Sequence, residues 1–332
     1  MARAWHLISR PDGMPTQANF DLREVELPAL RDGDIRVKNA WLSVDPYMRG
    51  RMNDVKSYVP PFALEAPMDG GAIGEVVDSK AEGFAKGDQV LHMGGWRDEA
   101  VVAAKTAIKL PELGAQPNQF LGILGVTGST AYFGLLEAGQ AKAGDVVFVS
   151  AAAGAVGSAV VQIAKAKGMT VIGSAGGKDK CAVVKALGAD AVVDYRAGPV
   201  LKGLAKAVKE IGATGIDVYF DNVGGDHLDA ALALASQNAR FAICGMIDGY
   251  NSAEPTKLRF IARTIAARIN WKGFIVFDYQ SRMSEFYAEM GPLLKAGKVT
   301  AQETVVEGLD QTPDAFLGLF TGKNTGKMLV KL

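Results

Sequence analysis

The chain has 332 residues, of which 48% are hydrophobic and 22% are charged, as in ordinary globular proteins. Its length predicts two domains, because single hydrophobic cores stop growing at about 250–300 residues. Lysine plus arginine and aspartate plus glutamate each number 36, so the formal net charge is zero, and no basic tract marks a nucleic-acid surface. No apolar run is long enough to span a bilayer, so we expect neither a nucleic acid nor a membrane as a partner.

Residues that bind metals are few. The two cysteines, Cys181 and Cys244, exclude a zinc site made of four cysteines, and the three histidines supply no clustered ligands for a catalytic zinc. Two separated cysteines also argue against a disulfide framework and favour a reducing compartment. The N-terminus lacks the long apolar segment of a secretory signal. We therefore expect a cytoplasmic protein without a metal.

The first part of the chain, residues 1–121, has the pattern of a β-rich domain. Short apolar runs rich in branched residues are separated by turns that contain Pro, Gly and Asp. The predicted strands are 35–44, 71–77, 88–93 and 99–104. This pattern predicts a small, strongly bent barrel.

From residue 122 onward, strand-like runs alternate with segments of helical length. The predicted strands are 146–149, 170–173, 191–194, 217–221, 241–244 and 273–276, and the predicted helices are 156–167, 179–187, 201–211, 228–234 and 283–296. This alternation predicts an α/β domain with a doubly wound parallel sheet over residues 122–301. The strand-like ending KMLVKL lies in the last segment, 302–332, which we expect to return to the first domain.

The first strand of this domain runs into a bend of small residues, VFVSAAAGAVGS. Its spacing, Ala152-x-Gly154-x-x-Gly157, matches the dinucleotide fingerprint with alanine at the first glycine. Gly154 lets a pyrophosphate approach the backbone, and Gly157 lets the helix pack on the strand. The helix then starts at Ala155 and Val156, whose free N–H groups favour phosphate. A plain strand-to-helix turn is the alternative interpretation.

The end of the second strand, VIGSAGGKDK, bears on which dinucleotide binds. A site for NAD usually places an acid there to hold the ribose 2′-hydroxyl. This chain instead has Ser174, Lys178 and Lys180, which favour a 2′-phosphate. We therefore expect NADP(H). A solvated helix start would also explain the lysines.

A resemblance to a known family rests on stretches spread over nearly the whole chain, in the family's order. They are LSVDPYMRGRM (42–52), GGW (94–96), the segment from TAYFGL to AVGS (130–158), KALGAD (185–190), FDNVGG (220–225), CGMIDGYN (244–251), GFIVFDY (273–279) and NTGKMLV (324–330). Together they resemble the zinc-independent branch of the medium-chain dehydrogenase/reductase superfamily. That branch includes leukotriene B4 dehydrogenases, prostaglandin reductases, plant alkenal reductases and bacterial curcumin reductases.

The resemblance implies a GroES-like β-barrel for residues 1–121 with 302–332, which bears substrate and catalytic residues, and a Rossmann domain for 122–301, which binds NADP. It also implies NADPH-dependent reduction of carbon–carbon double bonds conjugated to a carbonyl, with a small enone or enal as substrate. By this resemblance the 2′-phosphate meets Lys180 and Tyr195. The other implied cofactor contacts are Asn222, Cys244, Gly245, Tyr250, Phe274, Ile275, Val276 and Asn324.

The sequence departs from the family pattern in two places near the implied site. Ala153 stands where the family often has serine, and the segment VTGSTAYFGL (126–135) replaces MPGLTAYFGL. The position of the Gly-His-Glu of zinc-dependent relatives, 69–71, has no histidine.

Reduction of an enone places negative charge on the carbonyl oxygen, so a hydroxyl donor there lowers the barrier. Tyr250 is the first candidate, and Tyr47 is the second because it can line the cleft from the barrel side. The nicotinamide ribose 2′-hydroxyl is an alternative donor. A quinone reductase of the same superfamily and a non-catalytic NADPH-binding protein are the competing functions. We also expect a homodimer, paired through the apolar segment 268–277.

Overall fold

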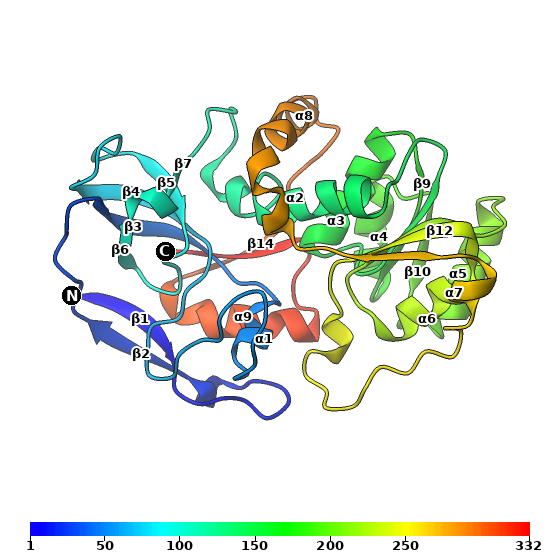
Figure 1. Cartoon of the computed structure of the whole chain (residues 1–332), viewed down its shortest axis with the longest axis horizontal. Helices are drawn as coiled ribbons and strands as arrows, with labels where there is room; N and C mark the ends of the chain where they lie inside the picture. The colour runs from blue at the N-terminus through cyan, green and yellow to red at the C-terminus, as the bar shows by residue number, and fades with distance from the viewer. The chain divides into compact units, whose positions relative to one another are not determined.

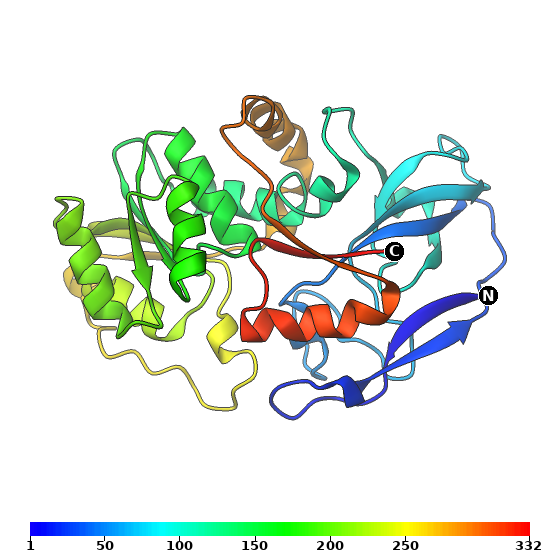
Figure 2. The ribbon, with the colours of Figure 1, turned by 180° about the vertical axis from the view of Figure 1, so that it is seen from behind.

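The computed structural model describes all residues, 1–332, and they form two compact units. The first unit comprises Met1–Leu121, Glu303–Asn324 and Met328–Leu332. The second comprises Gly122–Gln302 and Thr325–Lys327. Figures 1 and 2 show the ribbon from two sides.

The first unit is built mainly from antiparallel strands. Its strands are β1 (Ala2–Leu7), β2 (Phe20–Val25), β3 (Asp34–Ser43), β4 (Ala72–Ser79), β5 (Gln89–His92), β6 (Glu99–Ala103), β7 (Ile108–Lys109), β14 (Glu303–Glu307) and β15 (Lys327–Lys331). Its helices are α1 (Met48–Arg51) and α9 (Thr312–Thr321). β1 pairs with β2, and the larger sheet has the order β14-β15-β3-β4-β5-β7, with β6 on β3. β15 pairs antiparallel with β3, so the end of the chain adds a strand to the larger sheet.

The second unit contains one parallel sheet with helices between its strands (Figure 1). The strands are β8 (Val146–Val149), β9 (Thr170–Ala175), β10 (Ala191–Asp194), β11 (Ile216–Asp221), β12 (Ala235–Ile243) and β13 (Asn270–Gly273). The helices are α2 (Val126–Phe133), α3 (Ala155–Ala166), α4 (Lys178–Ala186), α5 (Val200–Glu210), α6 (Gly225–Ala233), α7 (Arg263–Ala266) and α8 (Met283–Lys295). The strand order β10-β9-β8-β11-β12-β13 places the first strand in the middle, which is the doubly wound arrangement. The expected fold class is confirmed.

The last two strands of this sheet differ from the prediction. β12 begins at Ala235 instead of residue 241, and β13 covers Asn270–Gly273 instead of 273–276. β13 pairs with the end of β12, and its last pair joins Gly273 to Ile243. Since β12 ends at Ile243, residues after Gly273 have no strand to pair with. They continue as a 3-10 helix over Val276–Arg282.

Large buried aromatic side chains form the core on one face of the parallel sheet. The Phe148 ring stacks on Tyr219 with centroids 5.2 Å apart, and Tyr219 meets Phe241 at 5.3 Å. All three side chains are fully buried. This packing fixes the spacing of β8, β11 and β12, whose carboxyl ends carry candidate site residues. No helix of the chain has the length and apolar character needed to cross a bilayer.

Candidate functional site: a dinucleotide cradle

The bend after β8 is held by its own backbone. The chain leaves the strand at Ser150, takes a left-handed conformation at Ala151 (φ 48°) and enters α3 with Gly154 as its N-cap. The Gly154 N–H donates to the Ala151 carbonyl at 2.8 Å. The Ala152 N–H donates across to the Ser174 carbonyl of β9, also at 2.8 Å. Small residues are needed here because the backbone of three segments converges.

The two glycines of the bend meet different surroundings. A Cβ on Gly157 would lie 2.8 Å from the Ala151 carbonyl carbon and from the Ala152 Cα, and closer still to the Ala151 oxygen. Helix α3 therefore requires glycine at 157 in order to pack on the bend. A Cβ on Gly154 would meet only the Ala151 oxygen, at 3.2 Å. No other atom beyond the neighbouring residues lies within 4 Å of that position, which suits a close approach of phosphate.

A returning segment lines one side of this bend. The Gly326 N–H donates to the Ala153 carbonyl at 2.7 Å, and Gly154 and Gly326 form a parallel bridge. Gly326 has a left-handed φ of 69°, which favours glycine. Asn324, a predicted cofactor contact, stands two residues earlier in the chain and belongs to the first unit.

The carboxyl ends of β9 and β10 gather positive charge. Lys178 and Lys180 lie in the first turn of α4, and Arg196 is the second residue after β10. Burial, and then repulsion from Arg196, lower the pKa of Lys180. The Arg196 guanidinium lies near Gly177, 3.8 Å from where a Cβ would stand, and it forms no ion pair. The positive charge of Lys178, Lys180 and Arg196, here called the cation corner, fits an anionic group.

Asp194, at the end of β10, is a carboxylate close to this charge, and Asp179 stands between the two lysines in the first turn of α4. Asp194 Oδ1 accepts the backbone N–H groups of Gly177 and Arg196, each at 2.9 Å. These hydrogen bonds hold the pKa of Asp194 below its usual range, so the carboxylate is ionised and occupied with backbone. Tyr195 lies between Asp194 and Arg196 in the chain. Its hydroxyl oxygen contacts Gly176 and lies 2.5 Å from the position that a Cβ on Gly176 would take. Gly176 must be glycine for this contact.

Ser174, which the sequence predicts to favour the 2′-phosphate, has a buried side chain with a protein partner. Its side chain is fully buried, and its Oγ lies 2.9 Å from Nε2 of His227. The hydroxyl thus contacts a buried protein partner, while the Ser174 carbonyl supports the bend. A strand alternates its side chains between two faces, and α6 covers the face to which Ser174 points. The sequence does not reveal which helix covers that face.

Hydrogen bonds tie together the ends of β8, β11 and β12. The Asn222 N–H donates to Ser150 Oγ at 2.9 Å, and Asn222 Nδ2 donates to the Ser150 carbonyl at 2.8 Å. The Asp221 carbonyl accepts the N–H groups of Cys244 and Gly245, both at 3.0 Å. The predicted residues Asn222, Cys244 and Gly245 are therefore held at one edge of the sheet.

The Asp221 carboxyl lies beneath this edge and shapes its turn. It is fully buried and accepts the Tyr219 hydroxyl at 2.7 Å and the Gly224 N–H at 2.8 Å. Burial and the Asp221 charge raise the pKa of the Cys244 thiol to about 12. Cys244 is consequently a protonated packing residue at neutral pH.

Tyr250 lies beside the same edge, at the end of a 3-10 helix over Ile247–Gly249. A Cβ on Gly245 would come within 3.1 Å of the Tyr250 hydroxyl, so glycine at 245 makes room for that oxygen. Phe274 follows β13, and its ring meets Phe220 with centroids 6.2 Å apart. Ile275 and Val276 continue from there into the 3-10 helix and do not extend the strand.

Tyr47 belongs to the first unit and precedes α1. Burial, followed by the Asp45 charge, raises its pKa, so its hydroxyl keeps its proton at neutral pH. Arg51, which the sequence did not single out as a site residue, forms a two-bond ion pair with Asp69. The Arg51 guanidinium also stacks on Phe62, 3.9 Å from the ring centroid.

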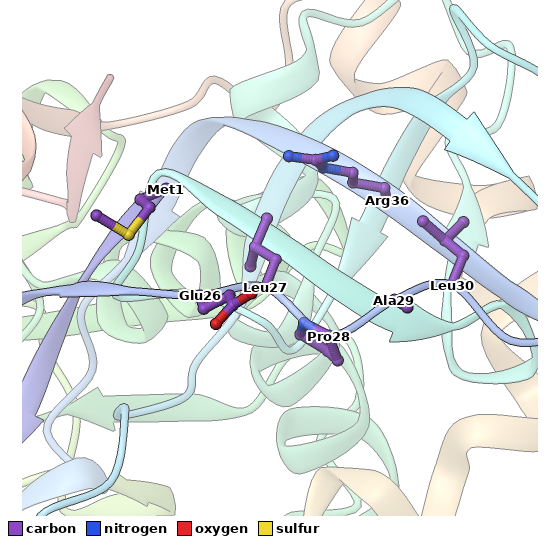
Figure 3. A pocket seen from close by; sticks show the side chains of 7 residues that line it. All are labelled: Met1, Glu26, Leu27, Pro28, Ala29, Leu30 and Arg36. Carbon is purple, nitrogen blue, oxygen red and sulfur yellow. The ribbon is translucent and has the colours of Figure 1, made fainter.

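One hollow of about 280 Å³ lies on the first unit and is unrelated to these residues (Figure 3). Met1, Glu26, Leu27, Pro28, Ala29, Leu30 and Arg36 line it. None of them is a predicted site residue. No group of three or more His, Cys, Asp and Glu side chains is arranged to hold a metal ion.

Comparisons with known proteins agree with this geometry. Residues 3–110 match the model for the N-terminal domain of oxidoreductase, and residues 155–293 match that for zinc-binding dehydrogenase. The NADPH-dependent curcumin reductase of Escherichia coli is 40% identical, over 99% of this chain and 96% of that protein. The NADP(+)-dependent 2-alkenal reductase of Nicotiana tabacum is 39% identical, over 96% and 94%. The crystal structure of CurA in complex with NADPH from Vibrio vulnificus is 41% identical, with a TM-score of 0.92 over 99% of this chain and 98% of that one.

The fold and the cradle define a two-domain oxidoreductase of the GroES-like and Rossmann type. The chain belongs to the medium-chain dehydrogenase/reductase family, in the branch of the curcumin, alkenal and prostaglandin reductases. The family predicted from the sequence is thereby confirmed.

Proposed function

We propose that the chain is an NADP(H)-dependent reductase of the carbon–carbon double bond in α,β-unsaturated aldehydes and ketones. The observation that carries this proposal is the cradle over Gly154 together with the cation corner of Lys178, Lys180 and Arg196, where Asp194 accepts backbone N–H groups. Relatives that are named for curcumin and alkenal reduction support the substrate class.

The residues of the second unit fit a phosphorylated dinucleotide. The pyrophosphate would lie over Gly154 and the start of α3, where N–H groups face the open side. The 2′-phosphate would meet Lys178, Lys180, Tyr195 and Arg196. The ribose and nicotinamide would lie along Asn222, Cys244, Gly245, Tyr250 and the segment 274–276, and Asn324 is the proposed contact from the first unit.

The chemistry divides between the cofactor and two tyrosines. When bound, reduced NADP would supply the hydride for the β-carbon of the substrate. The α-carbon of the resulting enolate would take its proton from Tyr250 or from water. The Tyr250 hydroxyl, for which Gly245 leaves room, would donate a hydrogen bond to the substrate carbonyl oxygen as negative charge develops there. A donor in that position is worth about 3 kcal/mol of barrier. Tyr47, held protonated by burial, is the second proposed donor, from the first unit.

The test is NADPH oxidation with a 2-alkenal and with benzoquinone, in the wild type and in Tyr250→Phe. We expect faster turnover with the alkenal, and a loss of about 100-fold in kcat in the variant. Tyr279→Phe is the matched control, since that ring stacks on Phe133 at 4.7 Å and is not a proposed contact. Preference for the quinone would identify a quinone reductase, and no turnover with any acceptor would identify a binding protein.

We also propose a homodimer that pairs through the β13 edge. β13 is the last strand of the parallel sheet, so one side of it has no neighbouring strand. Two apolar side chains near this edge are exposed, Ile261 at 49% and Ile265 at 83%. A second copy would satisfy the edge and cover both side chains.

A further inference from the structure

A buried polar pair, His227 and Ser174, has no part in the proposed chemistry. His227 is 6% exposed and Ser174 is fully buried, and their side chains are 2.9 Å apart. His227 lies in α6, which follows β11, whereas Ser174 lies in β9. β8 separates β9 from β11 in the sheet, so the pair joins the two halves of the doubly wound fold.

Each member of this pair contacts a part of the proposed cofactor site. The Ser174 carbonyl accepts the Ala152 N–H at 2.8 Å, which fixes the dinucleotide bend. The His227 ring meets Tyr195 edge-on, with centroids 5.4 Å apart and planes at 80°. The Tyr195 hydroxyl in turn covers Gly176. One imidazole therefore supports the bend through Ser174 and the loop before α4 through Tyr195.

The chemistry of the imidazole suits this role. Burial lowers the pKa of His227 to about 4, so the ring is neutral at physiological pH and can share one hydrogen bond with a hydroxyl. A phenyl ring would fill similar space but would leave the Ser174 hydroxyl buried without a partner. The polar identity of residue 227 therefore matters, and its volume alone does not suffice.

We infer that His227 is a positioning residue for the adenosine 2′-phosphate end of the cofactor, which it serves by fixing Ser174 and Tyr195. This inference rests on the proposed NADP(H) function. The His227 ring also stacks on the core residue Phe148, with centroids 6.5 Å apart, but its contacts with Ser174 and Tyr195 lie on the adenosine side of the proposed site. Its loss should therefore weaken binding of that end and spare turnover at saturating cofactor.

The probe is adenosine 2′,5′-bisphosphate, which carries the 2′-phosphate without the nicotinamide. Calorimetric titration should show binding weakened about tenfold or more in His227→Phe, with kcat at saturating NADPH within about twofold of the wild type. Ser174→Ala should weaken binding as well, and the double variant should lose less than the sum of the two, because the residues act as one pair. His227→Gln, which retains a hydrogen-bonding group, should recover part of the affinity.

His92→Phe is the matched control. His92 is the other deeply buried neutral histidine, with Nε2 2.9 Å from Asn39 Oδ1 in the first unit. Its replacement should lower stability and leave the affinity for the bisphosphate unchanged. If His227→Phe, His227→Gln and Ser174→Ala all fold and all bind the bisphosphate as tightly as the wild type, this inference is overturned. The proposed NADP(H) function would still stand. A wild type that binds neither the bisphosphate nor NADPH would overturn the cofactor assignment, and this inference with it.

Discussion

Replacing each glycine of the bend by alanine should separate folding from cofactor binding. At Gly157 the added methyl would lie 2.8 Å from two backbone carbons and closer to the Ala151 oxygen, where ordinary contacts exceed 3.4 Å. The backbone must then shift, which costs about 1–3 kcal/mol of folding free energy. At Gly154 the only neighbour is the Ala151 oxygen, at 3.2 Å. The cost to stability there should stay within about 1 kcal/mol.

For NADPH binding the order of the two variants should be reversed, with the larger effect at Gly154. The methyl of Gly154→Ala would occupy the space over which the pyrophosphate is proposed to lie, so NADPH affinity should fall about tenfold or more. Urea unfolding and NADPH fluorescence titration measure the two quantities. Gly198→Ala is the control, because nothing lies within 4 Å of its added Cβ. Wild-type NADPH affinity in Gly154→Ala would refute the cradle, and wild-type stability in Gly157→Ala would refute the packing argument.

Three further outcomes are expected. The folded-state pKa values of His92 and His227 are both about 4, against 6.5 in the unfolded chain. Between pH 4 and pH 6.5 the unfolded state therefore binds more protons than the folded state. The free energy of unfolding should be fully retained above pH 6.5 and should fall as the pH drops towards 4. Urea titrations should show a loss of at most about 3 kcal/mol per histidine. Cys244 should react with iodoacetamide at pH 8 far more slowly than a free thiol, as followed by mass spectrometry, since its pKa is about 12. Ile265→Asp should convert the proposed dimer to a monomer in light scattering, and a monomeric wild type would contradict the edge pairing.

The sequence was most informative where backbone sterics dictate residue type. The bend of small residues predicted the strand, the turn and the start of α3. Position 157 requires glycine because a side chain there would clash with the backbone of Ala151. The alternation of strands and helices predicted the doubly wound sheet. The sheet's last strand was misplaced, because the apolar run at 273–276 resembles a strand, while the partner β12 ends at Ile243.

The residues that sequence reasoning missed depend on contacts between distant segments. Arg196 is adjacent to the start of α4 only because β10 lies beside β9, and strand order is not encoded in local pattern. The one available signal was its place directly after Tyr195, at the end of a predicted strand. His227 was missed because its partner Ser174 is 53 residues away and faces α6. The directions of the Arg196 and His227 side chains come from packing between segments that are distant in the sequence.

The most direct test of the account is the ratio of the dissociation constants for NADH and NADPH, measured in the wild type and in a Lys180→Ala/Arg196→Ala variant. The cation corner predicts that the wild type binds NADPH about 100-fold more tightly or better, and that the variant loses most of this difference through weaker NADPH binding alone. Equal affinities in the wild type, or tighter binding of NADH, would contradict it.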